Sequence, residues 1–182
     1  MNYANIKYRD IADGEGVRTT LFVSGCSHHC ENCFQPETWS FSYGREFTTD
    51  IADEVLATLD DFFVDGLTFL GGEPMEPENQ HGLLKLAKRA KALHPEKSIW
   101  CYTGDVYEDL VDAASPRHTE ETDELLGLID VLVDGPYIDS LRDITLRFRG
   151  SSNQRVIDMN ETRKTGEVVL WKDEEVYSTH SM

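Results

Sequence analysis

Short apolar runs alternate along the chain with longer segments whose apolar residues recur at helical spacing. Each run is rich in β-branched or aromatic residues, and a glycine closes it or follows within two residues. Runs of this length and composition predict buried strands. The four predicted strands are residues 17–25, 67–70, 98–102 and 130–135.

The segments between these runs predict helices that bury one face. Thr48 or Thr49 can cap the first helix, and Pro95 stops the second. Two further helical patterns cover residues 105–114 and 119–129. The residues predicted to face inward are Ile51, Val55, Leu59 and Phe62 in the first helix, and Leu83, Leu86, Ala90 and Leu93 in the second.

Strands that alternate with helices predict right-handed crossovers and a largely parallel sheet. The tail differs, because residues 167–179 predict two short strands around Lys172, an edge β-hairpin. We expect one α/β domain spanning residues 1–182. In such sheets ligands bind outside the carboxyl ends of the strands. The unusual short motifs of the sequence lie there: the cysteine loop, GGEP, YTG and VDG.

Composition and charge narrow the class of protein. The chain has 182 residues, 40% hydrophobic and 28% charged, as soluble globular domains do. Its 34 acidic and 17 basic residues give a formal charge of −17, so we expect no direct binding to nucleic acid. No stretch approaches the roughly 20 apolar residues of a membrane helix, and MNYANIKYRD lacks the features of a signal peptide. We therefore expect a cytoplasmic protein without a membrane partner, whose thiols stay reduced.

Three of the four cysteines form the pattern C-x3-C-x2-C: Cys26, Cys30 and Cys33. Closely spaced thiolates suit zinc or an iron–sulfur cluster. A structural zinc would need a fourth ligand, for which His28, His29 and Cys101 are candidates, but no second pair of ligands is present. A four-iron cluster held by three cysteines keeps one iron open, and we favour it. Cys101 stands inside an apolar run, which predicts a core residue.

Five stretches between residues 13 and 158 match one known family. They are DGEGVRTTLFVSGCSHHCENCF, FLGGEPM, WCYTG, DVLVDGPYI and RFRGSSNQRVID. The cysteine motif followed by GGEP resembles the radical S-adenosylmethionine superfamily. The last two stretches resemble, within it, the family of proteins that activate anaerobic ribonucleoside-triphosphate reductase. One departure is Asn32, where many superfamily members carry an aromatic residue before the third cysteine.

The resemblance implies an enzyme with a [4Fe-4S] cluster on Cys26, Cys30 and Cys33 and S-adenosylmethionine at the open iron. One electron cleaves the sulfonium to methionine and a 5′-deoxyadenosyl radical, which takes a hydrogen atom from a glycine of the partner enzyme. The implied partners are the reductase and a flavodoxin or ferredoxin-type electron donor. The residues implied around S-adenosylmethionine are Asn32, Cys33, Phe34, Gly71, Gly72, Glu73, Thr103 and Asp134.

The chemistry of these residues leaves some alternatives open. Gly71 and Gly72 permit close approach of the backbone to a ligand, and Glu73 offers an anion to its ammonium, but a plain strand-to-helix turn is the other interpretation. Thr103 and Asp134 can contact the ligand carboxylate or ribose, help to hold a cation nearby, or cap the next segment. Neutral His28 and His29 are expected to donate to cluster sulfurs or to face solvent.

The segment 149–155, RGSSNQR, is basic in an acidic chain. It is either a structural turn or a contact for the cofactor carboxylate or the partner's glycine loop. The chain is also shorter than the ~250 residues of a complete eightfold barrel. We expect a partial barrel of the radical S-adenosylmethionine type, open at the side, as a protein substrate would require. The alternatives are an activator of another glycyl-radical enzyme, such as pyruvate formate-lyase, and a non-catalytic zinc-binding module.

Overall fold

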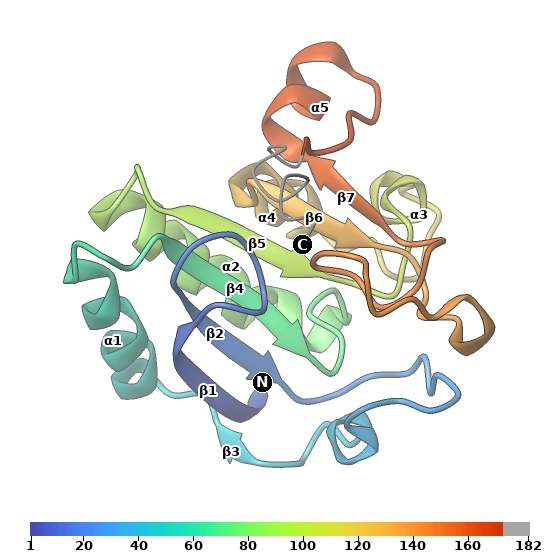
Figure 1. Cartoon of the computed structure of the whole chain (residues 1–182). Coiled ribbons are helices and arrows are strands. Elements are labelled where there is room, and N and C mark those ends of the chain that lie inside the picture. Colours follow the sequence, from blue (N-terminus) through green and yellow to red (C-terminus); the bar gives the residue numbers. More distant parts are fainter. Residues whose placement is uncertain (173–182) are drawn as a thin grey trace, which may run out of the picture.

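A seven-stranded sheet runs through the computed structural model, which describes residues 1–172 (Figure 1). Its strands are β1 (Asn2–Asp10), β2 (Arg18–Val23), β3 (Arg45–Glu46), β4 (Gly66–Gly71), β5 (Ser98–Tyr102), β6 (Val131–Asp134) and β7 (Arg155–Asp158). They lie in the order β3-β1-β2-β4-β5-β6-β7. The central strands β2, β4, β5 and β6 are parallel, and β1, β3 and β7 are antiparallel to their neighbours.

Helices connect the parallel strands and cover one face of the sheet (Figure 1). They are α1 (Thr49–Ala57), α2 (Pro77–Leu93), α3 (Tyr107–Val111) and α4 (Thr122–Leu128), with α5 (Met159–Thr165) after the last strand. Three short 3-10 helices are η1 (Pro36–Trp39), η2 (Thr58–Asp60) and η3 (Asp139–Leu141). The loop 11–17 and the segment 136–154 lie on the other face of the sheet (Figure 1).

Strand β5 shows how the sheet divides the core into two layers. Ile99 and Cys101 point toward the helices and are buried in the main core, whereas Trp100, one step along the strand, points the other way. Its ring meets Phe148 and Trp171 edge to face, with centroids 5.0 and 5.6 Å apart. The prediction that Cys101 is a core residue is confirmed, since 0% of its surface is exposed.

The four predicted strands and their parallel arrangement are confirmed, but the three strands at the sides of the sheet were not predicted. Strand β1 is nine residues long, yet only Tyr3 and Asp10 in it are buried, so it shows no apolar alternation. Strand β7 has four residues, of which Ile157 alone is buried. Apolar runs therefore could not predict these side strands, because one face of each strand is exposed to solvent.

Two of the predicted inward-facing helical residues are placed wrongly by the periodicity. Helix α1 ends at Ala57 and continues only through η2, so Phe62 lies beyond it and is 93% exposed. Leu93 is the last residue of α2 and is 60% exposed, because the helix end projects from the core. The predicted cap is confirmed at Thr48, whose hydroxyl accepts the N–H of Ile51 at 3.4 Å. The two later helices, α3 and α4, are shorter than predicted at both ends.

The predicted tail hairpin does not form within the described residues. Residues 167–172 contain no strand, and Leu170 makes one isolated antiparallel bridge to Ile157. The second predicted arm lies in residues 173–182, outside the part of the chain that the structure describes. The antiparallel neighbour of β6 is instead β7, which precedes the tail.

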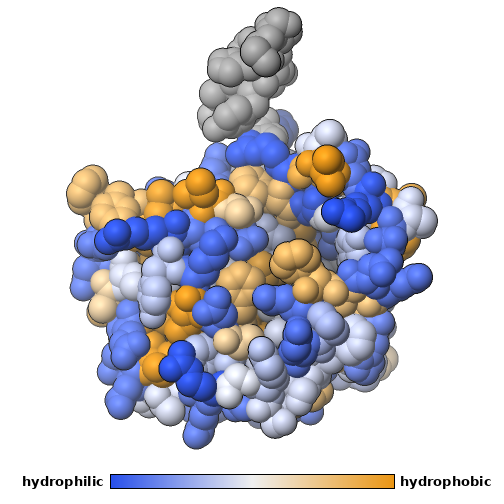
Figure 2. Space-filling view, turned by 60° about the horizontal axis from the view of Figure 1, so that its bottom comes forward, coloured by the Kyte–Doolittle hydropathy of each residue, from blue (hydrophilic) through white to orange (hydrophobic). Residues whose placement is uncertain are grey.

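No helix within residues 1–172 combines the length and the apolar character needed to cross a bilayer. Hydrophilic side chains cover much of the face in Figure 2, and hydrophobic surface forms separate patches between them. Large apolar side chains that are more than 70% exposed are Ile11, Phe34, Phe62 and Ile144.

Candidate functional site

A cavity of about 830 Å³ opens at the carboxyl ends of β2, β4, β5 and β6. The turn after each of these strands contributes to its wall: the cysteine loop, the GGEP turn, the YTG turn and the turn from Gly135 to Tyr137. The volume is in the range of small-molecule sites. The four motifs that the sequence places at strand ends therefore share one cavity.

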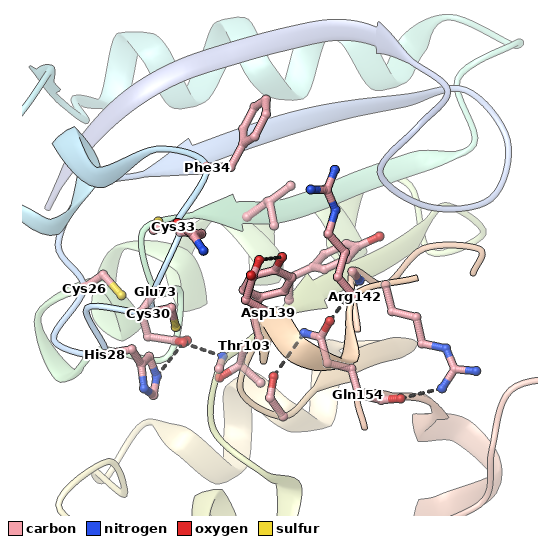
Figure 3. Close-up of a pocket in the computed structure, with 18 of the residues that line it drawn as sticks. Cys26, His28, Cys30, Cys33, Phe34, Glu73, Thr103, Asp139, Arg142 and Gln154 are labelled. Atoms are coloured by element: carbon pink, nitrogen blue, oxygen red, sulfur yellow. Dashed lines mark hydrogen bonds and ion pairs between the residues drawn. The ribbon is translucent and has the colours of Figure 1, made fainter. Parts of the chain in front are cut away.

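Cys26, Cys30 and Cys33 all line this cavity, and all three are free thiols (Figure 3). They lie on the loop that leaves β2, on the side of the cavity opposite Arg142 and Gln154 (Figure 3). Burial, together with the nearby carboxylate of Glu73, raises the pKa of Cys26 to about 11. A cation at the thiols would be needed to hold Cys26 as a thiolate, as metal ligation does.

One zinc ion and an iron–sulfur cluster, the two metal groups considered, require different spacings of their donor atoms. Four thiolates around one tetrahedral zinc, with Zn–S of about 2.3 Å, stand about 3.8 Å apart. Among the described residues, one set of three His, Cys, Asp or Glu donor atoms lies within 4.8 Å of one another, and no cysteine belongs to it. Three free, unpaired thiols on one cavity wall fit a larger iron–sulfur group.

The two glycines of GGEP bring the ends of β4 and β2 together. Gly71 has a φ of +109°, and a Cβ there would lie 2.5 Å from the backbone nitrogen of Val23. A Cβ on Gly72 would lie 2.5 Å from the carbonyl oxygen of Gly25. The N–H of Gly72 donates to the carbonyl of Val23, and that of Glu73 to Gly25, each at 2.8 Å. Gly72 lines the cavity, whereas Gly71 lies outside it and lets β4 approach β2 closely.

The carboxylate of Glu73 connects the cysteine loop with the GGEP turn and the YTG turn (Figure 3). One oxygen accepts the N–H of Met75 at 2.7 Å, and the other accepts the N–H of Gly104 at 2.7 Å. The second oxygen also contacts Nε2 of His28 at 3.1 Å. A carboxylate has about four lone-pair sites, so Glu73 keeps acceptor capacity for a ligand in the cavity that it lines.

His28 lies among carboxylates, which neither alternative for it anticipated. Its Nε2 is 3.1 Å from Glu73 and 3.3 Å from Asp105. Hydrogen bonds with Asp105 and Glu73 raise the pKa of His28 to about 10. His29 is exposed, and its ring meets Trp39 edge to face at 4.6 Å. His28 therefore belongs to the floor of the site as a cation.

Three further predicted residues line the cavity in different ways. Asn32 is exposed and has a φ of +55°, and Phe34 is 98% exposed at the mouth. Thr103 is buried, and its hydroxyl accepts the N–H of Asp105 at 3.1 Å, as in the capping alternative. Of the three, Asn32 and Phe34 have surface available for a ligand, while the Thr103 hydroxyl has a structural partner.

Asp134 is not among the residues that line the cavity. Its carboxylate is fully buried, accepts Nε–H of Arg155 at 3.0 Å and accepts the N–H of Tyr107 at 2.8 Å. Arg155 in turn reaches Glu108 with both terminal nitrogens, at 3.0 and 2.6 Å. This ion pair ties β6 to β7 and to the start of α3 behind the cavity wall.

The wall opposite the cysteines comes from the segment 136–154, which sequence analysis largely missed. Tyr137, Arg142, Arg149 and Gln154 line the cavity from this segment. Gln154 organises its end: Oε1 accepts the N–H of Gly150 at 2.9 Å, and Nε2 donates to Gly135 at 3.1 Å. The RGSSNQR segment is thus a hydrogen-bonded turn that also presents Arg149 to the cavity. The polar and basic composition of this segment was the one feature of the sequence that pointed to its role.

Comparison with known proteins agrees with this donor set. A family model described as "4Fe-4S single cluster domain" matches residues 12–157. Three relatives carry the name anaerobic ribonucleoside-triphosphate reductase-activating protein. That of Vibrio cholerae is 41% identical over 85% of this chain and 96% of its own. That of Escherichia coli K12 is 39% identical over 86% and 97%, and that of Enterobacteria phage T4 is 38% identical over 86% and 93%.

These matches run through both the cysteine loop and the opposite wall of the cavity, so they cover the whole candidate site and not the cluster motif alone. The chain therefore belongs to the family of anaerobic ribonucleoside-triphosphate reductase-activating proteins and contains a 4Fe-4S single cluster domain.

Proposed function

We propose that this chain is the enzyme that generates a glycyl radical on an anaerobic ribonucleoside-triphosphate reductase by reductive cleavage of S-adenosylmethionine. One observation carries the proposal. Three free thiols face a cavity built from four strand ends, in a chain that matches named activating proteins over nearly their whole length. The match to a 4Fe-4S single cluster domain favours this function over a zinc-binding interaction module.

Cys26, Cys30 and Cys33 would hold the cluster. When bound, a [4Fe-4S] group held by these three thiolates would supply a binding position for S-adenosylmethionine and the one electron needed to split its sulfonium into methionine and a 5′-deoxyadenosyl radical. The protein holds the cysteine loop, shields the cavity from water and orients the ligand. The buried carboxylate of Glu73 fixes the turns beneath the loop.

S-Adenosylmethionine would lie between the cysteine loop and the turns after β4 and β5. Backbone at Asn32, Cys33 and Phe34 would border the adenine, and exposed Phe34 offers it an apolar face. Gly72 and Glu73 line the cavity and would receive the ligand ammonium. Three further residues would shape the site without touching the ligand through a side chain, because each already contacts another part of the protein. They are Gly71, Thr103 and Asp134.

The substrate would be a glycine-bearing segment of the reductase. We infer that the four central parallel strands correspond to part of a barrel of the radical S-adenosylmethionine type, in a single domain, whose open side the wall 136–154 would occupy. A flavodoxin or ferredoxin-type protein would deliver the electron. The reducing cytoplasm that such thiols and donors require is the proposed location.

The proposal is tested by loading the protein with iron and sulfide under anaerobic conditions and adding S-adenosylmethionine and a chemical reductant. We expect 5′-deoxyadenosine to form, and a glycyl-radical signal to appear in electron paramagnetic resonance when the reductase is added. Pyruvate formate-lyase serves as the second protein substrate. A radical on pyruvate formate-lyase alone would favour the alternative activator, and zinc without iron or sulfide in the purified protein would exclude the proposed enzyme.

Charge reversal at Arg149 is expected to separate cleavage of S-adenosylmethionine from activation of the reductase. Arg149 lines the cavity wall, and the loss of one charged hydrogen bond to the docked reductase costs about 1.5–3 kcal/mol, or about tenfold or more. Arg149→Glu should therefore lower glycyl-radical formation at least tenfold and leave formation of 5′-deoxyadenosine largely intact.

Arg89→Glu is the matched control for this reversal. Arg89 forms an exposed pair with Asp53, so the variant changes the net charge equally on a surface that carries no cavity residue. If Arg89→Glu weakens activation as much, long-range repulsion is responsible, and added salt should relieve it. If Arg149→Glu lowers both activities together, Arg149 serves the cavity, through S-adenosylmethionine or through its hydrogen bond to the carbonyl of Gln154, and the docking role is wrong.

A further inference from the structure

Arg117 lies at the point where three turns of the site meet. It belongs to the connection between α3 and α4, 90 residues from Ser27 in the sequence. Its guanidinium forms an ion pair with Glu76, lies 3.0 Å from Asp105 through Nε, and donates from Nη2 to Oγ of Ser27 at 2.9 Å. Only 13% of its side chain is exposed. One group therefore bridges the cysteine loop and the turns after β4 and β5.

Ser27 follows the first thiol of the site and is held at two points. Its N–H donates to Oε1 of Glu76 at 2.6 Å, while its hydroxyl accepts a hydrogen bond from the guanidinium of Arg117. Nη2 of Arg117 also lies 3.4 Å from Nε2 of His28, the next residue along the loop. Residues 24–30 contain no helix or strand of their own. These contacts from other segments hold the start of the loop, together with the backbone hydrogen bonds from Gly25 to Thr38 and from Cys26 to Trp39.

We propose that Arg117 is a positioning residue for the cluster-binding loop, which it clamps at Ser27 to the turns that carry Glu76 and Asp105. Arg117 does not line the cavity and touches none of the three thiols in the described contacts, so it acts through the residues between Cys26 and Cys30. The inference rests on the proposed cluster site. It does not depend on which protein receives the radical.

The shape of the guanidinium is as important here as its charge. Three carboxylates, those of Glu73, Glu76 and Asp105, meet beneath the loop, and Arg117 pairs with two of them. A planar guanidinium has donors that reach Glu76, Asp105 and Ser27 at once, whereas an ammonium is a point charge at the end of a flexible stem. Arg117→Lys therefore keeps the charge and removes the three-way geometry.

The test compares wild-type protein, Arg117→Lys and the control Arg163→Lys, each loaded anaerobically with iron and sulfide. Arg163 donates to the carbonyls of Leu126 and Ile129 at 2.9 Å, away from the cavity. The readouts are iron and sulfide per chain, the rate of iron loss to a chelator, the electron paramagnetic resonance spectrum of the reduced protein, and the thermal midpoint before loading.

Arg117→Lys should lose iron about tenfold faster than wild type and show a changed spectrum, because outer partners of metal ligands contribute about 10–100-fold to affinity. Its thermal midpoint before loading should match that of Arg163→Lys, which should retain iron like wild type. An unchanged rate and spectrum in Arg117→Lys would overturn the inference. So would an equal acceleration in Arg163→Lys, which would point to general loosening of the fold.

Ser27→Ala keeps the test decisive if Arg117→Lys fails to fold. It removes one hydroxyl on an exposed residue and leaves every buried charge in place. We expect iron loss several-fold faster than in wild type, since one charge-assisted hydrogen bond to the loop is lost while the ion pairs of Arg117 remain. Wild-type behaviour of Ser27→Ala would overturn the clamp. Absence of iron from wild-type protein would instead overturn the proposed function itself, so the two failures are distinguishable.

Discussion

Replacing Cys26, Cys30 or Cys33 by alanine is expected to remove most of the bound iron and all cleavage of S-adenosylmethionine. The three thiols line one cavity wall, and no fourth cysteine of the described chain reaches it. With two thiolates left, a four-iron group would have two unligated irons and would be lost readily to solvent. Iron and sulfide per chain, measured after anaerobic loading, and the yield of 5′-deoxyadenosine check this result.

Cys101→Ala is the matched control, because it removes a thiol of the same chain from the main core. Its side chain points toward the helices from the middle of β5, so iron and cleavage should both be retained. The ligand assignment fails if any one of the three alanine variants keeps full iron and full cleavage. It also fails if Cys101→Ala loses iron while its fold is intact.

Arg155→Met is expected to lower the free energy of unfolding by about 3 kcal/mol, the lower end of the cost of breaking a buried pair. The Asp134 side chain is 0% exposed and that of Arg155 is 31% exposed, so the substitution leaves a buried carboxylate without its cation. For a chain of this size the thermal midpoint should fall by about 6–12 °C. Denaturant unfolding of the protein before loading measures the change.

Two comparisons decide whether the loss comes from the unpaired carboxylate. Asp134→Asn combined with Arg155→Met should be more stable than Arg155→Met alone, since the uncompensated charge is gone. Arg89→Met removes a cation from an exposed pair with Asp53 and should cost less than about 1 kcal/mol. A double variant that is no more stable than the single one would contradict the role assigned to Asp134 as a structural anion.

The centre of the sheet was predictable from the sequence because its strands are buried on both faces. Strand β6 is buried throughout and β4 over its first four residues, so both appear as largely apolar runs. Strand β1 has one solvated side, and β7 is four residues long, so neither produces such a run. Phe62 and Leu93 were misplaced for a related reason: periodicity continues past the residue where the core ends.

The candidate site divides in the same way. The cysteine loop and GGEP were predictable because their chemistry is concentrated in a few adjacent residues at strand ends. The contribution of Tyr137, Arg142 and Arg149 to the cavity depends on how the segment 136–154 folds back over the sheet. No local pattern encodes such a return. Asp134 shows that a place at a strand end is not enough to predict a site residue. Its side chain bonds to Arg155 and does not line the cavity.

The clamp on the cysteine loop has a consequence for how the protein is made. Ser27 receives contacts from Glu76, 49 residues away, and from Arg117, 90 residues away. Contacts that close such long loops form late in folding, because their entropic cost precedes their gain. On the ribosome, the three thiols emerge well before residue 117, so the bond from Arg117 to Ser27 can form only after the shorter-range bonds of Gly25 to Thr38 and of Cys26 to Trp39. We expect iron insertion to be completed after the central sheet has folded, which leaves the nascent thiols open to oxidation until then.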